Sequence, residues 1–91
     1  MSPRPKLQRK ISSRFSNKKF KPEGKTGKKI EKIILQREEA QAISLVDISE
    51  MTQNKAAKKM KTSQSTLQRI LKKARKKIST AIIKGKKLEI E

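Results

Sequence analysis

Residues able to form hydrogen bonds with nucleic acid bases are concentrated between positions 63 and 69. The amides of Gln64 and Gln68 can pair with adenine, and the guanidinium of Arg69 matches O6 and N7 of guanine. The neighbouring hydroxyl groups of Ser63 and Ser65 can contact bases or phosphate oxygens. The candidate base contacts are therefore Ser63, Gln64, Ser65, Gln68 and Arg69.

Positive charge surrounds these residues without any acidic counterpart. Residues 52–86 hold 12 Lys and Arg side chains and no Asp or Glu. A solvent-exposed helix normally mixes both signs, because oppositely charged residues four positions apart stabilise it. A merely solvated face is the alternative, but the complete absence of acids favours binding to a polyanion. The candidate phosphate contacts are Lys55, Lys58, Lys59, Thr66, Lys72, Lys73 and Lys76.

The composition argues against an enzyme. The chain has no His and no Cys, which removes the commonest general base and the thiolate ligands of zinc. It also lacks a Gly-rich phosphate-binding loop. Asp47, the single aspartate, is expected to cap a helix or to form an ion pair. We therefore predict no catalytic residues, no metal site, no cofactor and no small-molecule ligand.

The net charge indicates the class of partner. The 91 residues include 26 basic and 8 acidic side chains, which gives a formal charge of +18. So large a charge on a small chain repels itself and implies a polyanionic partner, usually nucleic acid. No apolar run approaches the roughly 18 residues of a membrane span, and no secretory signal is visible. We expect a cytoplasmic, nucleoid-associated protein, with an amphipathic helix on an anionic membrane as the alternative.

The elements that must position these side chains begin with a long helix over residues 63–84. Ser63 is a suitable N-cap and Gly85 a suitable stop, so the helix would be about 30 Å long. One apolar stripe, about 120° wide, follows its length. The stripe consists of Leu67, Ile70, Leu71, Ala74, Ile78, Ala81 and Ile82. Its C-terminal half needs a packing partner from the N-terminal segment, residues 30–35 or another subunit.

A shorter helix is predicted immediately before it, from the N-cap Thr52 to about Met60. Ala57 is small enough for a second helix to cross closely, as a helix-turn-helix requires. Lys61 and Thr62 form the turn, where Lys61 would need a left-handed backbone that Gly adopts more easily. A purely structural helical hairpin is the alternative interpretation.

The remaining segments complete an all-α fold, a three-helix helix-turn-helix core with a long third helix. Residues 37–48 predict the first helix, with Glu38 and Glu39 at its positive end. Residues 30–35 are aliphatic and fit either a strand or a helix. At the C-terminus, alternation around Leu88 and Ile90 is compatible with a short edge strand, paired with residues 7–11 or 30–35.

The chain divides into a basic arm, residues 1–29, and a helix-turn-helix domain, residues 30–91. The arm carries a net charge of +10 and too few apolar residues to form a packed unit, so we predict a flexible segment. It could contact DNA or serve only as a solubilising tail. The candidate arm contacts are Arg4, Lys6, Arg9 and Lys10.

Together these motifs resemble a family of small, uncharacterised, predicted DNA-binding proteins of archaea and bacteria, whose helix-turn-helix is similar to region four of sigma factors. The resemblance covers nearly the whole chain. It is carried by Pro3 to Lys6, Phe20 to Pro22, Glu39 to Ile43, Ala56 and Ala57, Arg69 to Leu71, and Gly85 with Lys86. This chain departs from the family at Asn54 and Lys55, usually acidic, and at Lys61, usually Gly. The resemblance implies DNA binding.

Sequence-specific binding to double-stranded DNA, as in a transcriptional regulator, is therefore the leading hypothesis. The alternative is nonspecific nucleic-acid binding, either chromatin-like or RNA-associated. Only Phe15 and Phe20 could stack on unpaired bases, which argues against RNA and single strands. A homo-oligomer would suit a palindromic site, although no separate dimerisation segment is visible.

Overall fold

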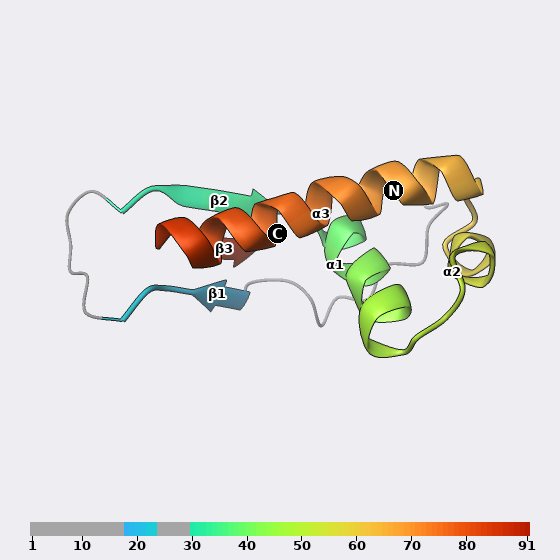
Figure 1. Cartoon of the computed structure of the whole chain (residues 1–91), viewed down its shortest axis with the longest axis horizontal. Helices are drawn as coiled ribbons and strands as arrows, with labels where there is room; N and C mark the ends of the chain where they lie inside the picture. The colour runs from blue at the N-terminus through green and yellow to red at the C-terminus, as the bar shows by residue number, and fades with distance from the viewer. Residues whose placement is uncertain (1–17, 24–29) are drawn as a thin grey trace, which may run out of the picture.

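The computed structural model describes residues 18–23 and 30–91. Its longest element is the helix α3 (Gln64–Lys84), which runs along the molecule from α2 to the strands (Figure 1). A short helix, α1 (Arg37–Ile43), lies against α3 and continues into a π-helical segment, η2 (Ser44–Ile48). The helix α2 (Gln53–Lys59) precedes α3. The predicted arm contacts lie outside the described residues.

The three predicted helices are present, and local residues account for their ends. The Ser63 hydroxyl accepts a hydrogen bond from the backbone N–H of Thr66 at 3.1 Å, which caps α3. At the other end Gly85 adopts a left-handed backbone, with φ of 64°, and terminates the helix. Thr52 caps α2 by accepting from the Lys55 N–H at 3.2 Å. The predicted first helix, residues 37–48, corresponds to α1 together with η2.

A small sheet accompanies the helices, so the fold is mostly helical rather than all-α. Its strands are β1 (Lys18–Phe20), β2 (Lys32–Leu35) and β3 (Lys87–Ile90), in the order β1-β3-β2. The strand β3 is antiparallel to β1 and parallel to β2. The expected C-terminal strand is therefore present, but it is the central strand and not an edge. Residues 30–35 supply one partner, as predicted, and β1 supplies the other.

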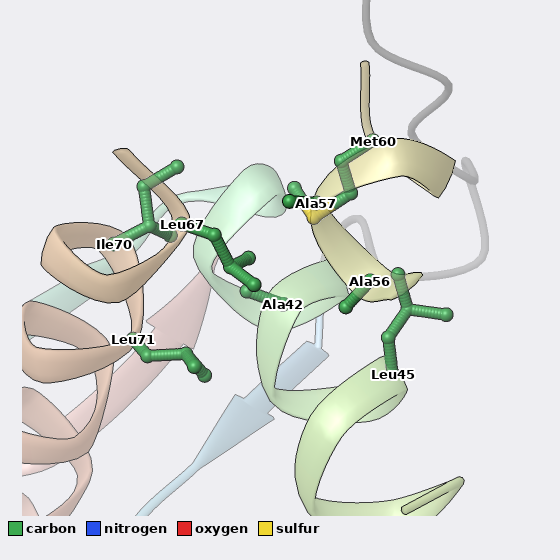
Figure 2. Close-up of a cluster of buried hydrophobic side chains, with 8 residues drawn as sticks. All are labelled: Ala42, Leu45, Ala56, Ala57, Met60, Leu67, Ile70 and Leu71. Carbon is green, nitrogen blue, oxygen red and sulfur yellow. The ribbon is translucent and has the colours of Figure 1, made fainter. Parts of the chain in front are cut away.

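Two apolar clusters hold these elements together. The first joins α1 and η2 to α2 and the N-terminal half of α3, around the fully buried Met60 and Leu67 (Figure 2). Ala56 and Ala57 face this cluster, and their small side chains let the helices approach closely. The second cluster joins the sheet to α1 and the middle of α3. It contains Leu35, Ala40, Ala74 and Ile90.

The predicted apolar stripe of α3 is buried only over part of its length. Leu67, Leu71 and Ala81 are buried, and Ile78 packs partly against the second cluster. Ile82 is 71% exposed, so the packing partner expected for this half of the stripe covers Ile78 and Ala81 but not Ile82 within the described residues. In the described ranges no helix is long and apolar enough to cross a membrane.

Candidate nucleic-acid interface

The first turn of α3 presents a cluster of hydroxyl groups at the surface. The Ser63 hydroxyl donates to Oγ1 of Thr66 at 2.9 Å while it also accepts from the Thr66 N–H. Its oxygen lies 3.3 Å from that of Ser65. Because these bonds already use the Ser63 hydroxyl, its first role is to cap the helix. A base contact from Ser63 would have to replace one of these bonds.

The other predicted base contacts are all exposed. Gln64, Gln68 and Arg69 make no side-chain hydrogen bond or ion pair with any residue that the structure describes. Their polar groups are therefore available for a ligand. Ser65 is also exposed and lies one turn before Arg69 on the same side of the helix.

Positive side chains continue from Arg69 along this surface. At 100° per residue, Arg69, Lys72, Lys73 and Lys76 occupy a sector about 100° wide, opposite Leu67 and Leu71. We call these four residues the cationic stripe. All four are exposed, and none forms an ion pair within the described part of the chain. Predicted phosphate contacts on α2 are exposed as well, namely Lys55, Lys58 and Lys59, whereas Thr66 is half-buried.

Two other cations of α3 are used within the fold, and sequence analysis did not assign them a role. Arg75 donates from Nη2 and Nε to the two carboxylate oxygens of Asp47, at 2.7 and 3.2 Å. This bond raises the pKa of Arg75 above its ordinary value. Asp47 is thus an ion-pair partner, one of its two expected roles. Lys77 donates to the buried carboxylate of Glu39 at 2.8 Å.

The buried carboxylate of Glu39 accepts two hydrogen bonds, one of which links α1 to α3. Besides the bond from Lys77, its Oε1 accepts from the backbone N–H of Gln36 at 2.8 Å, at the start of α1. The carboxylate therefore satisfies an otherwise unpaired helix donor and a lysine at once. The bond from Lys77 ties α1 to α3, alongside the apolar clusters in which the two helices pack together. The cationic stripe consequently points away from the packed helices.

A depression in the surface brings a further residue into this group. Gln53, the first residue of α2, lines a hollow of about 500 Å³ together with Gln68, Arg69 and Lys72 of α3. Sequence analysis did not identify Gln53 as a candidate contact. Its place directly after the N-cap Thr52 was the available signal, because backbone N–H groups there are free to bind an anion.

Comparison with known proteins identifies the family. The family model described as "Protein of unknown function DUF134" matches residues 1–91. The chain belongs to this family. A UPF0251 protein of Aeromonas salmonicida is 42% identical over 89 residues, which cover 98% of this chain and 87% of that protein. The resemblance to a family of uncharacterised bacterial proteins is confirmed.

Other relatives are longer than this chain. A UPF0251 protein of Clostridium botulinum is 40% identical over 97% of this chain, and a UPF0251 protein of Halothermothrix orenii is equally similar. The matched region spans 56% of the first protein and 65% of the second. No solved structure matches the chain.

Proposed function

We propose that the protein binds double-stranded DNA in a sequence-specific manner and acts as a transcriptional regulator. The observation that carries this proposal is the cationic stripe, which lies unpaired on the face of α3 opposite the core, while the exposed Gln64 and Gln68 lie in the first turns of the same helix. Cations without intramolecular partners suit phosphates, and exposed amides and guanidinium groups suit base edges. Because both kinds of contact are available, the surface suits DNA better than a polyanion that has no bases.

The arrangement of α2 and α3 supports a helix-turn-helix. Ala57 is 3% exposed and packs in the cluster that joins the two helices, where a larger side chain would separate them. Between them, Lys61 adopts a left-handed backbone with φ of 56°, a conformation that the turn needs and that Gly usually supplies. The N–H of Thr62 donates to the carbonyl of Ala57 at 2.9 Å and closes the turn.

In this proposal the N-terminal turns of α3 enter the major groove. Gln64, Gln68 and Arg69 contact base edges, and the lysines of the cationic stripe contact phosphates on the groove wall. Gln53 and the lysines of α2 lie beside the adjacent phosphates. With DNA as the ligand, we expect the protein to be associated with the nucleoid.

The competing proposal is nonspecific binding, which the excess of lysine on α2 and α3 favours. Selection from random duplex DNA at about 0.15 M salt tests the two proposals. A regulator should enrich one sequence and bind it at least about 10³ times more tightly than random duplex. If repeated rounds enrich no sequence while binding persists, the protein is a nonspecific binder.

A further inference from the structure

The end of the molecule that carries the sheet has a second surface with a different character, an apolar groove between α3, η2 and β1. Its lining includes the half-buried side chains of Ile43, Ile78 and Leu88. The lining also includes Phe20, Ile48 and Ile82, which are 56%, 73% and 71% exposed. The groove has a volume of about 500 Å³. Exposed apolar patches of this kind mark binding surfaces in soluble proteins.

The charges around the apolar groove are all of one sign. Lys18, Lys21 and Lys86 are among its lining residues, and no carboxylate lines it. Lys86 forms an ion pair with Glu31, which lies outside the groove. Lys18 and Lys21 have no ion-pair partner among the residues that the structure describes. The chemistry of the groove therefore calls for an apolar ligand with negative charges at its margin.

We propose that the apolar groove binds an amphipathic helix of another protein, with carboxylates flanking the apolar face of that helix. The part of α3 that lines the groove extends from Ile78 to Gly85, which is about 10 Å along the helix axis. Apolar anchors at positions i, i+3, i+4 and i+7 of a docked helix span the same length. Glutamates beside those anchors would face Lys18 and Lys21.

Charge and exposure decide against the other occupants. The N-terminal segment of this chain is one of them, but residues 1–17 hold five basic and no acidic side chains and so do not match the lysines at the groove. A second copy of the chain would bring its own Lys18 and Lys21 close to the same lysines, and each copy carries a net charge of +18. A single alkyl chain would leave much of Phe20, Ile48 and Ile82 uncovered, because these exposed side chains come from three different elements around an open groove, β1, η2 and α3. A helix about 10 Å wide offers enough surface to contact side chains from all three elements.

The docked helix would not compete with DNA. The apolar groove is lined by α3 from Ile78 onward, whereas the cationic stripe and Gln64 lie between residues 64 and 76, and Lys76 points to the side of the helix opposite Ile78. The two surfaces also occupy different elements elsewhere, the sheet and η2 for the groove and α2 for the DNA side (Figure 1). Substitutions can therefore remove one interaction and leave the other in place.

A synthetic helical peptide with Leu at the four anchor positions and Glu beside them provides the probe. Fluorescence anisotropy would measure its binding to the full chain at about 0.15 M salt, where surface electrostatics are screened beyond about 8 Å. Two control peptides have Lys in place of Glu, or the same composition in scrambled order. We expect the acidic amphipathic peptide to bind at least about tenfold more tightly than either control, a difference of about 1.4 kcal/mol.

Adjacent residues of α3 provide matched variants. Ile82→Glu places a charge in the groove and should weaken peptide binding at least about tenfold. Ile83→Glu is the control, because Ile83 is 80% exposed and does not line the groove. Likewise, Lys21→Glu should weaken binding more than Lys84→Glu, which makes the same charge change outside the groove. Arg69→Ala should leave peptide binding unchanged.

Three results would overturn the proposal. Equal binding of the ordered and scrambled acidic peptides would show attraction to net charge alone. Equal effects of Ile82→Glu and Ile83→Glu would place the peptide elsewhere. Self-association that Ile82→Glu abolishes, measured by sedimentation, would show that a second copy occupies the groove. Thermal melting of each variant checks that the fold is retained.

Discussion

At the scale of single residues, α3 separates its cations into two groups by their partners. Arg75 and Lys77 are held by Asp47 and Glu39, whereas the cationic stripe has no partner within the described residues. Sequence could not reveal this division, because the paired residues are 28 and 38 positions apart along the chain. Only the exposure of the stripe follows from helical spacing, since it lies opposite the apolar residues.

Substitutions in α3 should distinguish residues that contact bases from residues that contact phosphates. We expect Arg69→Ala and Gln68→Ala to weaken binding to a selected site by about 1–3 kcal/mol and binding to random duplex much less. Lys72→Ala and Lys76→Ala should weaken both about equally. Titration of each variant with both duplexes measures the difference. Identical behaviour of all four variants on every duplex would contradict sequence-specific binding.

The left-handed backbone of Lys61 gives a prediction for stability. A residue with a Cβ atom in this conformation lowers the free energy of unfolding by roughly 1–2 kcal/mol. Gly avoids this strain, but it gains more chain entropy on unfolding, which offsets part of the benefit. Lys61→Gly should therefore be neutral or slightly stabilising, and the β-branched Lys61→Val should be destabilising by about 1 kcal/mol or more. Urea denaturation measures both. A Lys61→Gly variant less stable than Lys61→Val would contradict the turn geometry.

At the scale of elements, the crossing of α2 and α3 depends on a buried small side chain. Ala57→Leu adds volume where Ala57 is 3% exposed, next to the fully buried Met60 and Leu67. We expect a loss of about 1–3 kcal/mol in the free energy of unfolding, because a well-packed core resists insertion. Thermal or urea denaturation would detect it, with the exposed Lys58→Leu on the same helix as control. An unchanged stability would show that the helices do not meet closely there.

The helices were predictable from the sequence because their signals are local. Thr52, Ser63 and Gly85 mark ends through bonds to residues within one turn, and the apolar spacing needs no partner to be recognised. The sheet was not predictable in the same way. β1 consists of two lysines and a phenylalanine, with no alternation, and it pairs with residues 88–90 at the other end of the chain. Helical spacing places Ile82 on the apolar face of α3 but does not tell what covers that face, and within the described residues Ile82 is exposed.

At the scale of the whole molecule, acidic and basic groups are unevenly distributed. Carboxylates of Glu31, Glu39, Asp47 and Glu89 are paired with lysine or arginine in the sheet and the middle of α3. The described part of the chain from Thr52 to the cationic stripe contains no acidic side chain. Among the described residues, the excess of positive charge is therefore greatest on α2 and the first half of α3, which lie at one end of the molecule (Figure 1).

This distribution predicts a steep dependence of DNA binding on salt. If the six predicted lysines on α2 and α3 each neutralise one phosphate, the logarithm of the association constant should fall with that of the salt concentration with a slope of about −5. Titrations of random duplex between about 50 and 200 mM salt measure the slope. Lys72→Ala should make it shallower by about one unit. A slope near zero would contradict phosphate contact by this surface.

The strand order β1-β3-β2 has a consequence for how the protein is made. β1 and β2 do not pair with each other. Both pair with β3, which is the last of the described elements in chain order. During synthesis on the ribosome, residues 18–20 and 32–35 therefore have no strand partner until residues 87–90 emerge, whereas α1, α2 and α3 can already pack. A stalled or prematurely terminated chain would leave the backbone N–H and C=O groups of both strands unpaired, and such groups promote aggregation.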